Sequence, residues 1–288
     1  MRDAPFEIVA QGFQFCEAPR ADADGRVCFS DLTGGGYYQC DDGTVDTLLA
    51  DRLWIGGATF DEGDAILLGG KGGLVLVQGG EAIPILTEIG GKPVVAVNDI
   101  EADAEGAIYG GTLDFGAIFE RGEVPSGGIL FRLAPSGELS ILRDDVVASN
   151  GIGFSPDGAW MYHSESTVGI WAWPLRDGIA KAPPTLIAPA DDCDGLAVDE
   201  EGGIWVAFWR EALVRRYRPD GTVERTIRLP FPNIVSLTFG GPERTDLYVT
   251  TGGDGQGGVI RIRSDIPGLA THRSRFTSTV RREWRHGP

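Results

Sequence analysis

The strongest constraint on the fold is a turn that recurs along the chain at nearly regular distances. It reads DADG at 22–25, DEG at 61–63, AEG at 104–106, PDG at 156–158 and EEG at 200–202, with a weaker sixth copy, GGPERTD, at 240–246. The glycines that end the first five copies lie 38, 43, 52 and 44 residues apart. This spacing is close to the length of one four-stranded propeller blade. Short apolar or alternating runs typical of strands follow the turns.

We therefore expect an all-β fold, a six-bladed β-propeller with a central metal site, formed as one domain by residues 1–270. A two-sheet sandwich or barrel is the alternative, because it also has many short strands with turn signals. The tail at 271–288 breaks the pattern with clustered arginines. We expect this tail either to be disordered or to dock locally on the acidic body.

The charge balance excludes several classes of partner. The chain has 42 acidic and 25 basic side chains and a formal net charge of −17, which repels phosphate backbones and anionic lipid surfaces. It has no apolar run of about 18 residues, and MRDAPFEIVA lacks the basic-then-apolar order of a secretory signal. We expect a cytoplasmic protein, a monomer or weak homo-oligomer, that binds a small-molecule substrate and neither nucleic acid nor membrane.

Nitrogen and sulfur ligands for a metal are scarce. Four cysteines, at 16, 28, 40 and 193, show no CxxC pairs and are expected to be reduced thiols. The histidines at 163, 272 and 286 are too scattered for a His-rich site. Any metal would depend on oxygen ligands.

The repeat supplies one comparable position in each unit. Counting back eight residues from each turn glycine, and matching SLTFGG to GLAVDE in the sixth unit, gives Glu17, Ile55, Asn98, Asn150, Asp194 and Val235. In a propeller the first strand of each blade lines the central channel, so these positions converge. Carboxylates and amide oxygens that face each other in a narrow channel stay unsatisfied unless a cation joins them. We expect one divalent ion, Ca²⁺ first, with Mg²⁺, Mn²⁺, Zn²⁺ and Fe²⁺ as alternatives.

Two other interpretations of these residues remain open. Asn-Gly and Asp-Gly are also common turn dipeptides, which would make Asn150 and Asp194 ordinary turn residues. Cys16 and Cys193 each precede a proposed ligand, and strand alternation should point them away from the ion as packed thiols. An irregular backbone would instead allow thiolate ligation, which would favour zinc.

Several ordered stretches resemble a known family. FCEAPRADADGRVCFSDL, VNDIEADAEGAIYGGTL, SNGIGFSPDGAWMYHSES, CDGLAVDEEGGIWVAFW and FGGPERTDLYVTT look like the repeated signatures of the gluconolactonase, regucalcin (senescence marker protein) and luciferin-regenerating enzyme family. The resemblance covers residues from about 12 to 265. It implies a six-bladed propeller with one divalent metal in its channel, and many members hydrolyse lactones.

The resemblance also implies roles for individual residues. The family's metal ligands fall on Glu17, Asn150 and Asp194, and its proposed general base also falls on Asp194. The Asn of its Asn-Asp motif, which contacts substrate or a metal-bound water, falls on Asn98. The family's sugar-lactone members often carry arginine two residues earlier, where this chain has Ala96. Metal-assisted hydrolysis follows, with the metal or Asp194 activating the water.

Further substrate contacts are expected around the channel mouth. The insertion at 113–128 could fold over it and bring Asp114, Phe115, Phe119, Glu120 or Glu123 near substrate, although a solvated loop is equally compatible with the sequence. Three residues outside the insertion, Trp54, Trp209 and Arg210, are candidates for a pocket wall and an anion clamp, the alternative being packing and surface charge.

Three functions fit these observations. The first is a metal-dependent lactonase acting on a sugar lactone or another small cyclic ester. The second uses the same ion for isomerisation or hydration of a carbonyl compound, which Ala96 leaves room for. The third is a non-catalytic calcium-binding or docking propeller, since fold does not dictate function.

Overall fold

The computed structural model describes residues 5–125 and 127–279. This part of the chain is nearly all β, and its named helical element is one short π-helix, η1 (Ala117–Arg121). Among the described helices, none combines the length and the apolarity that crossing a membrane would require.

The strands form a series of antiparallel sheets in chain order. The first contains β25 (Ile234–Gly240), β26 (Asp246–Arg263), β1 (Phe6–Ala21), β2 (Val27–Asp31), β3 (Tyr37–Asp41) and β4 (Thr44–Leu49). The next contains β5 (Ala58–Phe60), β6 (Ile66–Leu68), β8 (Leu74–Gln78) and β9 (Glu81–Leu86). A third joins β7 (Gly70–Lys71), β12 (Ala96–Ala102), β13 (Ile108–Thr112), β14 (Gly128–Leu133) and β15 (Leu139–Val146).

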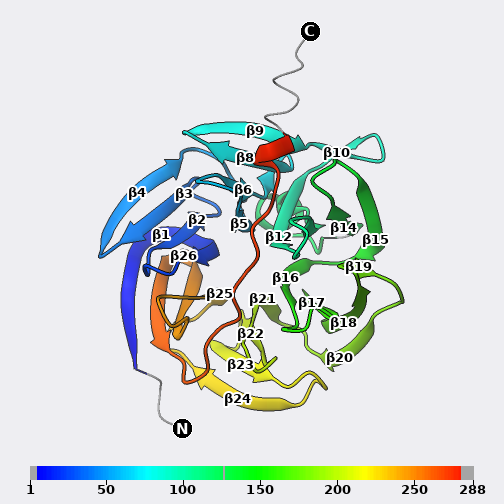
Figure 1. Cartoon of the computed structure of the whole chain (residues 1–288). Helices are drawn as coiled ribbons and strands as arrows, with labels where there is room; N and C mark the ends of the chain where they lie inside the picture. Colours follow the sequence, from blue (N-terminus) through cyan, green and yellow to red (C-terminus); the bar gives the residue numbers. More distant parts are fainter. Residues whose placement is uncertain (1–4, 126, 280–288) are drawn as a thin grey trace.

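The remaining sheets continue the same order. One contains β16 (Ser149–Phe154), β17 (Trp160–Glu165), β18 (Gly169–Arg176), β19 (Ile179–Ala180) and β20 (Thr185–Pro189). Another contains β21 (Cys193–Val198), β22 (Ile204–Phe208), β23 (Leu213–Tyr217) and β24 (Val223–Arg228), and a small hairpin pairs β10 (Glu88–Ile89) with β11 (Lys92–Pro93). Figure 1 shows the sheets around a common centre, with β5, β12, β16, β21 and β25 nearest to it and β4, β9, β15, β20 and β24 at the outside.

The two ends of the sequence meet in one sheet. The first half of β1 pairs with β26 from Phe6 to Phe15, and the second half pairs with β2 from Cys16 to Ala21. One strand therefore belongs both to the last sheet of the ring and to the first. This pairing closes the ring through hydrogen bonds between its two ends.

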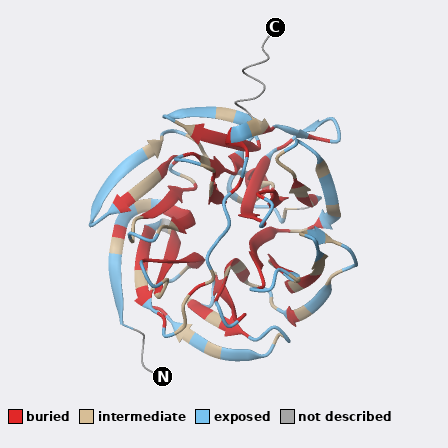
Figure 2. Cartoon of the chain, viewed as in Figure 1, coloured by how far each residue is buried: buried red, intermediate tan, exposed pale blue. Residues whose placement is uncertain are grey.

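Burial falls from the centre outward. The inner strands β12, β16 and β25 are buried along their whole length, whereas most residues of the outer strands β4 and β24 are exposed or partly exposed. Figure 2 shows this gradient as red inner and pale blue outer strands. The apolar core lies between neighbouring sheets: Trp205 of β22 packs in one cluster with Leu237 of β25 and Leu247 of β26.

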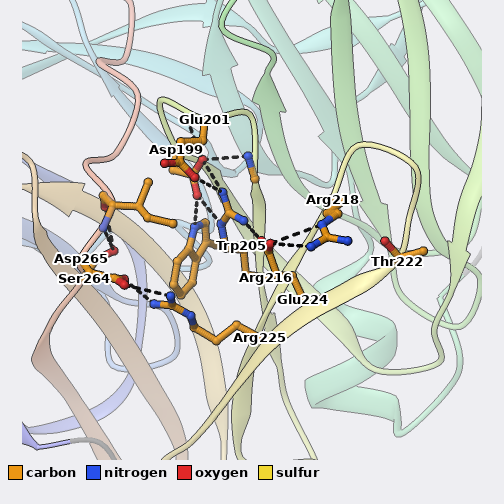
Figure 3. Close-up of polar contacts among 12 residues, drawn as sticks. Asp199, Glu201, Trp205, Arg216, Arg218, Thr222, Glu224, Arg225, Ser264 and Asp265 are labelled. Carbon is orange, nitrogen blue, oxygen red and sulfur yellow. Dashed lines mark hydrogen bonds and ion pairs between the residues drawn. The ribbon is translucent and has the colours of Figure 1, made fainter.

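The recurring turn has the structure that its sequence predicts. All five turn glycines have positive φ, from +66° at Gly158 to +87° at Gly25, a conformation that glycine adopts without steric cost. The aspartate three residues before Gly202 organises the turn: Asp199 accepts backbone hydrogen bonds from Glu201 (3.0 Å) and Gly203 (2.7 Å). It also binds Trp205 Nε1 (2.7 Å) and Arg216 Nε (2.6 Å), as Figure 3 shows.

The C-terminal segment crosses the centre of the ring. After β26 the chain pairs Gly268 with Asp199, which follows β21, and Ser274 with Asp61, which follows β5. Figure 1 shows β21 and β5 on opposite sides of that centre. The Asp61 carboxylate accepts hydrogen bonds from Ser274 Oγ (2.5 Å) and from the backbone nitrogens of Phe276 (2.8 Å) and Thr277 (2.9 Å). Residues 271–279 of the arginine-rich tail therefore dock on the body, and 280–288 lie outside the described residues.

Candidate functional site

The inner strands share one irregularity at the same place. It occurs in β1, β12, β16, β21 and β25 but not in β5. Each of the five carries one extra residue relative to its partner, between Glu17 and Arg20, Val97 and Ile100, Ser149 and Ile152, Cys193 and Leu196, and Ile234 and Leu237. A β-bulge bends its strand, interrupts the alternation of side chains and re-aims them. The bulges lie at the sequence positions of the predicted ring.

A cavity of about 440 Å³ opens above these bulges. Five of the six predicted ring positions line it, namely Glu17, Asn98, Asn150, Asp194 and Val235. Ile55 is fully buried and is not part of the lining. Residues from strands far apart in the sequence therefore meet at one floor.

Three carboxylates gather at this floor. One oxygen from each of Glu17, Asp99 and Asp194 lies within 4.8 Å of the others. Asp99 was not among the predicted ligands, because one residue per unit was assigned to the channel. The bulge in β12 brings the next residue into the group as well, and Asp99 lies just behind the floor, outside the cavity lining. The acidic residue directly after Asn98 was the available sequence signal.

The two asparagines are held together. Asn98 Nδ2 donates to Asn150 Oδ1 (2.7 Å) and to the Ser149 carbonyl (2.8 Å). Asn150 Nδ2 donates to Ser166 Oγ (2.6 Å), which donates in turn to the Cys193 carbonyl (2.6 Å). These contacts fix which end of the Asn150 amide is oxygen and leave its second lone pair for another partner.

The glycines after Asn150 and Asp194 allow the inner strands to approach closely. A Cβ on Gly151 would lie 2.2 Å from the Leu196 nitrogen, and one on Gly195 would lie 2.1 Å from Ser236 Oγ. Both Asn-Gly and Asp-Gly lie inside strands β16 and β21. The interpretation of these pairs as turn dipeptides is therefore wrong.

The floor is strongly biased toward cation binding. Burial, with the neighbouring Asp99 and Asp194 carboxylates, raises the pKa of Glu17 well above its ordinary value, and burial with Asp99 and Asp192 does the same for Asp194. Burial raises the pKa of Asp99 to about 7, despite the opposing charge of Arg20. Within the described residues, Asp99 Oδ2 is buried without a hydrogen-bond partner. A divalent cation fits this donor set, since hard oxygen ligands and uncompensated negative charge are what such ions require.

A buried arginine lies beneath the floor. Arg20 Nη2 donates to Glu101 Oε2 (3.0 Å) and to the Ile100 carbonyl (2.8 Å), and the side chains of both residues of this ion pair are about 10% exposed. Its charge lowers the pKa of Asp99 and of Glu17 against the larger effect of burial. Arg20 therefore offsets part of the negative charge from the side opposite the cavity.

One wall of the cavity is aromatic. Phe15 stacks on Trp209 with ring centroids 5.1 Å apart and an interplanar angle of 14°. Phe119 meets the edge of Phe15 at 5.8 Å and stacks on Phe115 at 5.9 Å. The insertion thus folds over the cavity, where Phe115, Phe119 and Glu123 line it.

Three predicted substrate contacts do not line the cavity. Asp114 accepts hydrogen bonds from Arg121 Nη2 (2.7 Å) and from the Ala117 backbone nitrogen (3.0 Å). Glu120, which lies in the π-helix η1, is also absent from the lining. Trp54 packs behind the wall against Phe115, with ring centroids 6.1 Å apart. Local capping and core packing hold these side chains away from the cavity.

The predicted pair Trp209 and Arg210 does line the cavity. Arg210 Nε is held by Asp192 Oδ1 (3.0 Å), and its backbone nitrogen also donates to that carboxylate. Four residues that the sequence did not predict lie at the same rim, namely Ser166, Thr167, Asp191 and Asp192. The acidic run before Cys193 was a sequence signal for Asp191 and Asp192, whereas Ser166 and Thr167 had none.

The cysteines beside the proposed ligands are packed thiols. Cys16 and Cys193 are both fully buried, and burial raises the pKa of Cys16 well above its ordinary value and that of Cys193 to about 12. Cys193 Sγ donates to the Glu165 carbonyl at 3.4 Å. Thiolates are therefore disfavoured at this site, and an oxygen-ligated ion is the better fit.

The chain matches a protein family and several known proteins. The family model described as the SMP-30/gluconolactonase/LRE-like region matches residues 15–253. The chain is 34% identical over 203 residues to a pentonolactonase of Haloferax volcanii, covering 64% of this chain and 66% of that protein. It is 30% identical to an L-arabinolactonase of Azospirillum brasilense, covering 95% and 93% of the two chains. A calcium-binding protein, regucalcin, from Agrobacterium tumefaciens has a similar fold, with a TM-score of 0.83, 21% identity and coverage of 94% and 98%.

Proposed function

Since the chain belongs to the SMP-30/gluconolactonase/LRE-like family, we propose that it is a divalent-metal-dependent hydrolase that opens lactone rings. Relatives named as lactonases support the hydrolytic activity. The observation that carries the metal requirement is the meeting of Glu17, Asp99 and Asp194 within 4.8 Å at the cavity floor. The sheets around the centre are interpreted as six propeller blades in a single domain, residues 1–270.

Glu17, Asn150 and Asp194 would hold the ion, with Ca²⁺ as the first candidate. Asp99 adds a third carboxylate behind them and strengthens the negative field without facing the cavity. When bound, a divalent cation would polarise the lactone carbonyl and stabilise charge that develops on its oxygen.

The chain's own residues would position substrate and move the proton. Asp194 lines the cavity, so a water there can reach its carboxylate and lose a proton to it. The water oxygen bonds to the carbonyl carbon, the ring C–O bond breaks, and the ring oxygen leaves as an alcohol after protonation. The products are one hydroxy acid, as its carboxylate, and one proton.

Asn98 would act as a positioning residue in this scheme. Both of its amide hydrogens are used, one on Asn150 and one on Ser149. Its Oδ1 faces Gly56, and a Cβ on residue 56 would lie only 1.8 Å from that oxygen. Asn98 therefore aligns Asn150 rather than offering a free donor to substrate.

A lactone panel tests the proposal. Wild-type protein should release protons from at least one γ- or δ-lactone. In Asp194→Ala this rate should fall about 10²- to 10⁴-fold while the protein remains folded, as expected for removal of a general base. Hydrolysis that survives Asp194→Ala, or a silent panel with an intact bound ion, would contradict it. The second outcome would favour a non-catalytic calcium-binding role.

A further inference from the structure

The cavity has two chemically different halves. The floor carries the carboxylates and asparagines, whereas one wall is built from Phe15, Phe115, Phe119 and Trp209 in continuous ring contact. Phe119 and Val124 extend this wall to the mouth, where their side chains are 42% and 76% exposed. Exposed apolar side chains at the mouth of a cavity are typical of a surface that covers an apolar ligand.

The amide and hydroxyl hydrogens of the floor are already used within the protein. Asn98 Nδ2 makes two hydrogen bonds within the protein, and Asn150 Nδ2 is bonded to Ser166 Oγ. The Ser166 hydroxyl donates its proton to the Cys193 carbonyl. Recognition of several hydroxyl groups needs free donors as well as acceptors, because an unpaired buried polar group is costly.

The rim carries more acidic than basic side chains. Asp191 and Asp192 line it together with Arg210. Asp192 accepts hydrogen bonds from Arg210 Nε (3.0 Å) and from the Glu211 nitrogen (3.1 Å), so one edge of the Arg210 guanidinium is held by a carboxylate, although its side chain is 71% exposed. Asp191 and Asp192 would repel a carboxylate group at this rim.

We propose that the preferred substrate is an uncharged lactone carrying an apolar arm, alkyl or aryl, rather than a polyhydroxylated sugar lactone. This inference rests on the proposed lactonase activity. The lactone ring lies over the acidic floor and the arm lies against the aromatic wall. The cavity volume of about 440 Å³ falls within the range of pockets that hold drug-sized ligands, which leaves room for an arm beyond the ring.

Two lactones with the same six-membered ring test this directly. The specificity constant kcat/KM is measured for δ-decalactone, which has an alkyl arm, and for D-glucono-δ-lactone, which has hydroxyl groups. We expect δ-decalactone to be preferred by at least about tenfold, the discrimination that a few methylene groups provide in an apolar pocket. A preference for the glucono-lactone would overturn the inference and leave the lactonase function intact.

A matched pair of variants assigns the preference to the wall. Phe119→Ser should raise KM for δ-decalactone about tenfold and leave the glucono-lactone reaction within about twofold. Phe6→Ser is the control, since Phe6 is similarly exposed, at 39%, and packs on Phe231 outside the cavity. Equal effects of Phe119→Ser on both substrates would contradict a specific role for the wall.

A binding measurement separates this inference from the proposed function. The δ-lactams that correspond to the two lactones resist hydrolysis, and their Kd values can be measured by calorimetry on the cation-loaded protein. Tighter binding of the alkyl lactam without turnover of either lactone would retain the apolar site and refute the lactonase. Tighter binding of the hydroxylated lactam, or binding of neither, would refute the apolar site.

Discussion

Asn98 Nδ2 donates a hydrogen bond of 2.7 Å to Asn150 Oδ1, joining inner strands β12 and β16 across 52 residues of sequence. This contact holds the Asn150 oxygen in place while Ser166 holds its nitrogen. Two residues that share a position in the repeat are thus partners in space. Their geometry makes Asn98 a support for the proposed ligand Asn150.

Replacing Asn98 should therefore weaken the ion site without touching its ligands. Asn98→Ala frees Asn150 to rotate and should raise the Kd for Ca²⁺ about 10-fold to 100-fold, the usual effect of losing an outer-shell partner. Calorimetric titration measures it. Asn233→Ala, which removes an amide that donates to the Gly252 carbonyl, is the control, and an unchanged Kd in Asn98→Ala would contradict the supporting role.

Asp99→Asn should have opposite effects on the free and the loaded protein. In the cation-free protein Asp99 is either ionised beside two other carboxyl groups or protonated at the cost of a raised pKa, so replacing it with a neutral amide should stabilise the cation-free fold. The same change weakens cation binding. Thermal melts with and without Ca²⁺ should show a higher Tm without the ion and a smaller ion-induced rise. A lower Tm without the ion would show that Asp99 is not repelled by its neighbours.

Cation affinity should rise with pH. The pKa values of Glu17 and Asp194 lie well above their ordinary values and that of Asp99 is about 7. These groups hold protons in the folded protein that a cation must displace, so binding tightens as pH rises through about 7. The stability of the cation-free protein should change in the opposite direction and fall as pH rises. A group whose pKa is higher in the folded than in the unfolded protein contributes stability below its unfolded pKa, and this contribution is lost as pH rises through its folded pKa. Kd values between pH 5.5 and 8.5 that do not change would contradict this.

The turn aspartates should matter in proportion to their burial. Asp199 is fully buried and binds Arg216, whose side chain is 5% exposed. Asp199→Ala removes a carboxylate that balances the charge of this buried guanidinium and should lower the free energy of unfolding by about 3–5 kcal/mol. Asp157→Ala, which changes an exposed aspartate directly before Gly158, should cost less than about 1 kcal/mol. Denaturant titrations compare them, and equal losses would refute the dependence on burial.

The sequence predicted the turns, the strands and five of the residues that meet at the cavity, because the repeat relates positions that are far apart. It could not predict Asp99, since strict alternation sends neighbouring side chains to opposite faces and only the bulge in β12 overrides that rule. It also could not show that Phe119 lines the cavity and that Glu120 does not. Their places depend on the π-helical turn at Ala117–Arg121 and on the Asp114–Arg121 contact within the insertion.

The most direct test of the central claim is restoration of activity by a metal ion. Proton release from the best lactone is followed with chelator-treated protein before and after Ca²⁺, Mg²⁺, Mn²⁺, Zn²⁺ or Fe²⁺ is added, with Glu17→Gln in parallel. We predict that the treated protein is inactive, that at least one ion restores turnover, and that Glu17→Gln shifts the required concentration upward at least about tenfold. Full activity after the ion has been removed, verified by elemental analysis, would contradict a metal-dependent mechanism.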